Sequence, residues 1–262
     1  TLLLIRHLLK GAIQMNAFFS SVAGCLVRWQ ALPGKGTPLV FVHGLGCASS
    51  YEYPRVVTDS AFGGRNAILI DLPGCGYSQK PQDYSYSISD QAKVVAELVD
   101  HLDFSAFFLY GHSMGGSISI EAAEIVQERL SGLVVSETNF HPGGGFFSKK
   151  IVSFPEEAFI HTAWQHMVEE ETSPWAGSLA VDAPWALWRG AASLIKGNNW
   201  LERFVHLSVK KQLIFGEFSL PDEDFTHLST SEISTCILPG CGHSMSWENP
   251  HALAGALSDF CR

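Results

Sequence analysis

A serine flanked by small residues is the first candidate for chemistry in this chain. It lies in Gly111-His112-Ser113-Met114-Gly115, a G-x-S-x-G pattern, with an apolar aromatic run before it and a helix-like segment after it. A serine on a tight turn between a buried strand and a helix is held in a strained, exposed position, and its neighbours must be small. We therefore predict that Ser113 is a nucleophile. Because a free serine hydroxyl is a weak nucleophile, it needs a base within hydrogen-bond reach.

Histidine is the side chain best suited to act as that base near neutral pH. His243 lies after the last strand-like run, in a glycine-rich segment free of helical constraint. Its rival His251 falls inside a predicted helix, while His43 and His112 flank the site and are expected to shape loops. We predict that His243 is the base.

Composition bounds the class of protein. The chain has 262 residues, 46% of them hydrophobic, and a net charge of −9. This length supports one large domain with an inserted subdomain, and the acidic charge without a basic run argues against nucleic acid or an anionic membrane as partner. The scattered cysteines lack C-x-x-C spacing, which argues against zinc and a disulfide framework and favours a reducing cytoplasm. They are Cys25, Cys47, Cys75, Cys236, Cys241 and Cys261.

The first 14 residues form an apolar stretch interrupted by Arg6 and His7. The stretch is too short to span a membrane, and it lacks the leading positive charge of a signal peptide. The first methionine is Met15. Residues 1–14 are therefore an N-terminal extension, either an amphipathic lead-in helix or upstream sequence that is not native, and both interpretations remain open.

Strand-like and helix-like runs alternate along the chain, which predicts an α/β protein with a mostly parallel central sheet covered by helices on both faces. The run at 25–32 alternates and stops at a Pro-Gly pair, which suits an edge strand. The other predicted strands are 38–42, 67–70, 106–110, 133–135, 212–215 and 233–238, and the predicted helices are 87–102, 114–129, 222–228 and 250–260. The last helix has Asn249 as its N-cap and Pro250 at its first position.

Residues 139–204 break this alternation, since they contain no convincing strand and open with Pro142 and three glycines. We predict a helical cap inserted at 139–204 into a core made of 15–138 and 205–262. The cap holds five of the seven tryptophans, and we expect two of these five to face substrate. The five are Trp164, Trp175, Trp185, Trp188 and Trp200.

Four segments, in order, resemble the α/β-hydrolase superfamily, and the resemblance runs from about residue 25 to residue 260. They are His43-Gly44-Leu45-Gly46 after the third strand, Asp71-Leu72-Pro73-Gly74-Cys75-Gly76-Tyr77-Ser78, the serine pentad, and Gly240-Cys241-Gly242-His243 followed by Glu248-Asn249-Pro250. The resemblance implies the α/β-hydrolase fold and a nucleophile, acid, histidine order along the chain. It also implies an oxyanion hole built from the backbone N–H groups of Leu45 and Met114.

The acid departs from the family pattern. Ser219 stands where the usual acid follows the seventh strand. Asp222 or Asp224, just downstream, could reach His243 if the loop folds back. Alternatively the acid is at the end of the sixth strand, as in haloalkane dehalogenase-like relatives, which points to Glu137. We predict Glu137, which would orient His243 and stabilise its protonated form.

Together these residues predict a serine hydrolase that cleaves a carboxylic ester of a small to medium apolar substrate through an acyl-enzyme, with no cofactor and no metal. Haloalkane chemistry is disfavoured because it needs a carboxylate nucleophile where Ser113 stands. Lactonase, C–C bond hydrolase, amidase and thioesterase activities remain open, because a fold does not fix a substrate. A ligand-binding protein on a hydrolase scaffold is the contrasting class. The sequence does not indicate an oligomeric state.

Overall fold

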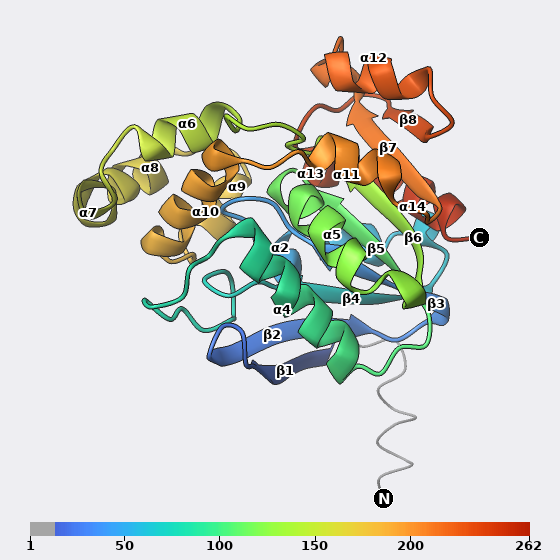
Figure 1. Cartoon of the computed structure of the whole chain (residues 1–262), viewed down its shortest axis with the longest axis horizontal. Helices are drawn as coiled ribbons and strands as arrows, with labels where there is room; N and C mark the ends of the chain where they lie inside the picture. The colour runs from blue at the N-terminus through green and yellow to red at the C-terminus, as the bar shows by residue number, and fades with distance from the viewer. Residues whose placement is uncertain (1–13) are drawn as a thin grey trace, which may run out of the picture.

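The computed structural model describes residues 14–262, so the predicted N-terminal extension lies outside the described residues except for Gln14. An eight-stranded sheet with the order β1-β2-β4-β3-β5-β6-β7-β8 crosses the molecule (Figure 1). The pairs β1·β2 and β2·β4 are antiparallel and all other pairs are parallel. The strands are β1 (Gln14–Ser20), β2 (Cys25–Leu32), β3 (Lys35–Val42), β4 (Arg65–Asp71), β5 (Phe107–His112), β6 (Leu130–Ser136), β7 (Lys211–Gly216) and β8 (Ser234–Leu238).

Every strand predicted from the sequence is present, which confirms the α/β class. One assignment is wrong: β2 is not an edge strand, because β1 pairs with it in full register from Gln14 opposite Ala31 to Ser20 opposite Cys25. The strand β1 therefore forms that edge of the sheet.

Two apolar clusters, one on each face of the sheet, form the core. On one face α4 (Ile88–His101) and α5 (Met114–Ile125), which lie in front of the sheet in Figure 1, bury their apolar stripes, together with Phe204 from α11 (Trp200–His206). On the other face α3 (Pro54–Val57) and α14 (Pro250–Phe260) pack on the central strands. The buried strands read as near-continuous apolar runs because both faces are covered.

The chain between β6 and β7 contains helices joined by short connections and no strand. In Figure 1 most of these helices lie to one side of the sheet. Helices α6 to α11 include a π-helical stretch at Phe159–Ala163. A third apolar cluster, which includes Ile151 and Leu187, gives this segment a small core of its own. The helices here are α6 (Phe146–Val152), α7 (Glu156–Ala158), α8 (Trp164–Glu170), α9 (Trp175–Leu179), α10 (Pro184–Lys196) and α11 (Trp200–His206).

Three shorter helices complete the structure near the carboxyl ends of the strands. They are α2 (Ser49–Glu52), α12 (Glu223–Ser229) and α13 (Met245–Glu248). The predicted cap of the last helix is confirmed, since the Asn249 side chain accepts a hydrogen bond from the Ala252 amide and Pro250 starts the helix. Within residues 14–262 no helix is both long and apolar enough to cross a membrane.

Candidate active site

Ser113 lies between β5 and α5, in a backbone conformation that side chains rarely adopt. Its φ is 53° and its ψ is −122°. The turn is tight: a Cβ on Gly115 would lie 2.3 Å from the Val42 carbonyl oxygen, and one on Gly111 would lie 2.3 Å from the Gly115 carbonyl oxygen. Only glycine fits at these two positions, so the sequence G-x-S-x-G is what allows the strained turn to form.

The register of the sheet puts Ser113 beside Glu137. His112 pairs with Ser136 across β5 and β6, so the next residue on each strand lies at the same carboxyl edge of the sheet. The Ser113 amide donates to the Ser136 carbonyl at 2.9 Å. Loops that follow parallel strands at this edge form the binding sites of open α/β sheets.

Glu137 binds His243. Its Oε2 lies 2.7 Å from Nδ1 of His243, inside the distance of about 3.2 Å expected for this pair, and its Oε1 accepts the Gly216 amide at 3.0 Å. The Glu137 side chain is 7% exposed, whereas that of His243 is 56% exposed. Burial raises the pKa of Glu137, but the hydrogen bond and charge of His243, with the Ser219 hydroxyl and the Gly216 amide, hold the net pKa below its ordinary value.

The other candidate acids have different partners. Asp222 accepts the Phe225 amide at 2.8 Å and caps α12. Asp224 lies 2.8 Å from Nε2 of His141. Ser219, at the usual position of the acid, provides a hydroxyl to Glu137 instead. The structure therefore brings His243 together with Glu137 and with neither aspartate.

Three other histidines, which the sequence offers as rival bases or as residues that shape loops, each have a partner of their own. His112 contacts the Ser136 hydroxyl through Nδ1 at 2.8 Å, and burial together with the charge of His243 lowers its pKa to about 3. His43 is fully buried, receives the Leu72 amide on Nε2 at 3.1 Å, and has a pKa lowered by burial. Both are held neutral, which suits the loop-shaping role expected of them. His251 is exposed and pairs with Asp59 at 2.9 Å.

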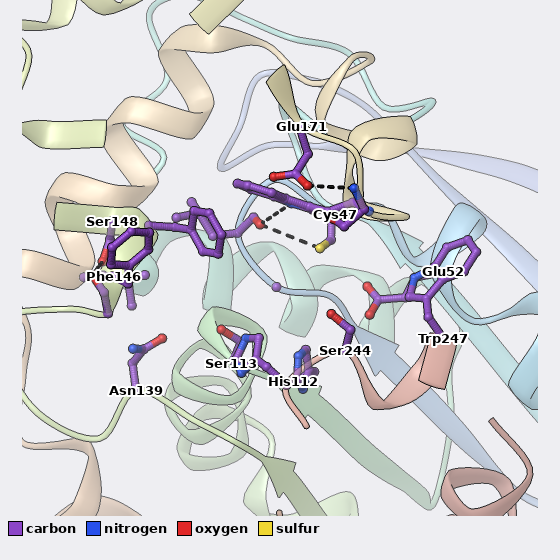
Figure 2. Close-up of a pocket in the computed structure, with 18 residues that line it drawn as sticks. Cys47, Glu52, His112, Ser113, Asn139, Phe146, Ser148, Glu171, Ser244 and Trp247 are labelled. Atoms are coloured by element: carbon purple, nitrogen blue, oxygen red, sulfur yellow. Dashed lines mark hydrogen bonds between the residues drawn. The ribbon is translucent and has the colours of Figure 1, made fainter. Parts of the chain in front are cut away.

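A cavity of about 550 Å³ contains both Ser113 and His243. Figure 2 shows Ser113 and His112 at its floor, with Ser148 and Phe146 at one end and Glu52 and Trp247 at the other. Within residues 14–262 the Ser113 hydroxyl has no hydrogen bond, so Ser113 and His243 share the cavity without a hydrogen bond between them. The lining residues are Gly44, Leu45, Cys47, Glu52, His112, Ser113, Asn139, Gly145, Phe146, Phe147, Ser148, Glu171, Ser173, Trp175, Leu194, His243, Ser244 and Trp247.

The residues predicted for the oxyanion hole flank Ser113. Met114 is the first residue of α5, where a backbone N–H has no partner inside the helix. Leu45 lines the cavity, and its carbonyl accepts Trp175 Nε1 at 3.2 Å, which anchors this loop to the helical segment above it. A Cβ on the adjacent Gly44 would lie 3.4 Å from the Ser113 Cβ, so this loop closely approaches the serine.

One expectation about the tryptophans is wrong. Of the five between residues 139 and 204, only Trp175 lines the cavity. Trp200 is buried and donates to Glu121 at 2.8 Å, and Trp188 donates to the Phe154 carbonyl at 2.9 Å. These two hydrogen bonds hold the indole rings of Trp200 and Trp188 against other parts of the protein and not toward the cavity. The second tryptophan of the cavity, Trp247, lies in α13, shortly after His243.

Sequence reasoning missed two polar residues of the cavity. Glu52 is 5% exposed, and burial raises its pKa above the ordinary value despite a hydrogen bond from Ser246 at 2.8 Å. Cys47 lies beside it, and burial with the nearby charge of Glu52 raises the pKa of the thiol well above its ordinary value. A thiol in that state is a poor nucleophile, so Cys47 does not compete with Ser113. Neither residue belongs to a motif that would have marked it. Within the described part of the chain no group of three or more His, Cys, Asp or Glu side chains is arranged to hold a metal ion.

Comparison with known proteins gives the family. Residues 37–193, more than half of the chain, match the family model described as the alpha/beta hydrolase fold. The chain therefore belongs to the α/β hydrolase fold family, as its motifs predicted.

Individual relatives are similar over shorter stretches. The dihydrolipoyllysine-residue acetyltransferase component of the acetoin cleaving system of Pseudomonas putida is 36% identical over 118 residues, 44% of this chain and 30% of that protein. Haloalkane dehalogenase 2 of Mycobacterium tuberculosis is 32% identical over 110 residues, 42% of this chain and 37% of that protein. The chain thus aligns with about a third of the length of these curated relatives.

The likeness to solved structures extends over nearly the whole chain. A thermophilic esterase from Thermogutta terrifontis superimposes with a TM-score of 0.77 at 19% identity, covering 94% of this chain and 97% of that one. At this level of identity the likeness shows a shared fold.

Proposed function

We propose that this protein is a serine hydrolase that cleaves carboxylic esters through an acyl-enzyme. The observation that carries the proposal is the 2.7 Å contact between Glu137 and Nδ1 of His243, in a cavity that also holds the strained Ser113. A nucleophile, a base and an acid that orients the base form the constellation needed for acyl transfer.

In the first step Ser113 Oγ attacks the ester carbonyl carbon and its proton passes to Nε2 of His243. We assign the proton on Nδ1 from its hydrogen bond to the Glu137 carboxylate, which leaves the Nε2 lone pair free to accept. The low pKa of Glu137 keeps it ionised, so it stabilises the imidazolium that forms. The hydrogen bond between Ser113 and His243 would form on substrate binding, since such contacts often tighten only in the bound complex.

The tetrahedral intermediate places a negative charge on the former carbonyl oxygen. The amides of Leu45 and Met114 would donate to this oxygen, and the Met114 amide carries the partial positive charge of a helix N-terminus. When the intermediate collapses, the bond to the leaving alcohol breaks and His243 returns the proton to the alcohol oxygen. A water molecule then repeats the sequence on the acyl-enzyme, releasing the carboxylic acid and regenerating Ser113.

The helical segment at 139–204 acts in this proposal as a cap that selects the substrate. It contributes Phe146, Phe147 and Trp175 to one end of the cavity, and the rings of Phe147 and Trp175 lie 4.7 Å apart. Aromatic walls of this kind bury apolar groups well. We therefore expect a small to medium apolar ester, with the chain on one side of the carbonyl held against the cap.

The nature of the relatives narrows the chemistry. The Mycobacterium tuberculosis relative is a haloalkane dehalogenase, and the Thermogutta terrifontis neighbour is an esterase. Displacement of halide needs a carboxylate nucleophile, and this chain has a hydroxyl at Ser113. Attack by a serine on a carbonyl carbon agrees with the esterase and not with the dehalogenase.

The test is turnover of p-nitrophenyl esters from acetate to octanoate, with lactones, aryl amides and thioesters assayed in parallel. We expect ester hydrolysis that Ser113→Ala abolishes without loss of the folded state, as judged by circular dichroism and thermal unfolding. If the protein preferred a lactone, an amide or a thioester to every simple ester, the proposed substrate class would be wrong, whereas the proposed serine mechanism would stand.

Covalent labelling identifies the nucleophile directly. A fluorophosphonate should modify Ser113 alone, although Ser148, Ser173 and Ser244 also line the cavity. Peptide mapping distinguishes the four serines. Modification of another serine, or ester turnover retained by Ser113→Ala, would contradict the assignment. A protein that binds esters without turnover or labelling would be a binding protein on this scaffold.

A further inference from the structure

A buried glutamate lies at the end of the cavity opposite the cap. Glu52, the last residue of α2, is 5% exposed, and Figure 2 shows its carboxyl group directed toward the space beside Ser244. Oε1 accepts the hydroxyl of Ser246 at 2.8 Å. Oε2 is also buried, and within residues 14–262 it has no hydrogen-bond partner. The mechanism above gives this residue no role.

The hydrogen bond between Glu52 and Ser246 joins the two short helices that follow Leu45 and His243 along the chain. Ser246 lies in α13, three residues after His243. Glu52 lies in α2, which follows the loop of Leu45. The same two regions meet a second time, because Tyr51 packs on the Trp247 ring at 5.1 Å. The base and one oxyanion donor are therefore tied together through α2 and α13.

A third contact strengthens this junction. The guanidinium of Arg55, in α3, lies 3.5 Å from the centroid of the Trp247 ring. The positive charge of Arg55 therefore lies over the face of Trp247, where the ring quadrupole attracts it. The segment from His243 to Trp247 is therefore held by contacts to α2 and α3.

His243 depends on such external support. Its side chain is 56% exposed and contacts Glu137 through Nδ1, with the His112 ring at 4.7 Å. These contacts fix one edge of the imidazole. The direction of Nε2 toward Ser113 is set by where the backbone of the loop lies, and a displacement of about 1 Å can cost about a hundredfold in rate.

Packing alone does not explain a glutamate at this position. A buried carboxyl oxygen without a partner is unfavourable, and an apolar side chain of the same size would fill the space without that cost. Burial raises the pKa of Glu52 and so disfavours its charged form, although the charge of His243 acts in the opposite direction. Residues that are unfavourable for folding are expected at functional sites.

We propose that Glu52 is a positioning residue for His243, and that its hydrogen bond to Ser246 keeps Nε2 of the imidazole aimed at Ser113. This inference rests on the proposed esterase function, because it concerns the rate of a step that His243 carries out. The role requires a hydrogen-bond acceptor at Oε1 and does not require a negative charge.

The experiment compares four single variants and one double variant with the wild-type protein on p-nitrophenyl butanoate. Glu52→Gln keeps an acceptor for Ser246, whereas Glu52→Met keeps the length of the side chain and removes the acceptor. Ser246→Ala breaks the same bond from the other side. Val99→Ala, in the core face of α4 on the other side of the sheet from α3, is the control for a loss of stability without a change in the site.

We expect kcat to fall about tenfold or more in Glu52→Met and in Ser246→Ala, with KM within about twofold of the wild-type value. The double variant Glu52→Met/Ser246→Ala should lose no more than either single variant, since all three break one bond. Glu52→Gln should recover most of the lost kcat. Val99→Ala should lower the thermal unfolding temperature while its kcat stays near the wild-type value.

Three results would overturn the inference. The first is a Glu52→Met enzyme whose kcat falls no more than that of Val99→Ala. The second is a rise in KM with kcat unchanged, which would make Glu52 a substrate-binding group. The third is a Glu52→Gln enzyme as slow as Glu52→Met, which would mean that the charge matters.

Failure of the proposed function would look different. In that case the wild-type protein itself would hydrolyse none of the esters, lactones, amides and thioesters. The comparison would then use the rate at which a fluorophosphonate modifies Ser113, because this reaction also needs His243 as base. The same ranking of the variants by labelling rate would support the inference, and equal labelling rates would refute it.

Discussion

The contact between Glu137 and His243 gives the sharpest test of the catalytic assignment. The carboxylate of Glu137 accepts two N–H groups, from Nδ1 of His243 at 2.7 Å and from the Gly216 amide at 3.0 Å. In Glu137→Gln the side chain keeps its shape but offers one acceptor and one NH₂ donor. One of the two contacts must then set two donors against each other.

Both orientations of the glutamine harm the reaction. If its NH₂ group faces His243, the imidazole must accept at Nδ1 and carry its proton on Nε2, so it cannot take the proton of Ser113. If its oxygen faces His243, the tautomer survives but the imidazolium loses its carboxylate and the Gly216 amide loses its acceptor. The side chain of Glu137 is 7% exposed, so water cannot readily replace it. The equivalent change in a serine protease lowers kcat by about 10⁴, or about 5 kcal/mol.

The assay is kcat for p-nitrophenyl butanoate, measured together with labelling by a fluorophosphonate. We expect Glu137→Gln to lose about 10⁴ in kcat and to label slowly. Asp222→Asn and Asp224→Asn are the matched controls, and each should cost little, since asparagine also caps α12 at position 222 and Asp224 contacts His141 and not His243. A Glu137→Gln enzyme within tenfold of the wild type, or an equal loss in either control, would refute the assignment of the acid.

Most of the fold could be predicted because the central strands carry a strong physical signal. Parallel strands covered on both faces need continuous apolar runs, and residues 107–110 are such a run. The edge strand β1 was missed, since it is polar at one end, at Gln14 and Asn16, and so lacks a continuous apolar run. That omission made β2 look like an edge. Its pairing with Gln14–Ser20 is a tertiary fact that the alternation of β2 alone does not contain.

The pairing of Glu137 with His243 was predictable because strand register is regular. Once β5 and β6 are neighbours, Ser113 and the end of β6 must share an edge of the sheet. The role of Glu52 was not predictable, because the sequence of a four-residue helix does not say which side chain faces inward. For the same reason, five tryptophans in one segment indicated a packed cap but not that only Trp175 reaches the cavity.

The remaining predictions concern the turn, the cavity wall and the buried acid. Gly115→Ala would bring its Cβ to 2.3 Å from the Val42 carbonyl, so we expect a loss of about 1–3 kcal/mol in unfolding free energy together with lost turnover; unchanged stability in urea unfolding would contradict the geometry of the turn. Trp175→Ala should lower the preference for hexanoate over acetate esters about fivefold, the loss of about 1 kcal/mol of apolar contact; an unchanged acyl profile would mean that the wall does not bind substrate. Glu52 has a pKa raised by burial, beside Cys47 and Tyr53. The folded protein therefore holds a proton that the unfolded chain releases above its ordinary pKa of 4.5. The sign follows: stability falls as pH rises from that value toward the raised pKa, by at most about 1.4 kcal/mol per pH unit. Glu52→Gln has no such proton, so its unfolding free energy relative to the wild type should increase as the pH rises above 4.5. A difference between the two proteins that stays constant with pH in urea titrations would show that folding does not raise the pKa of Glu52.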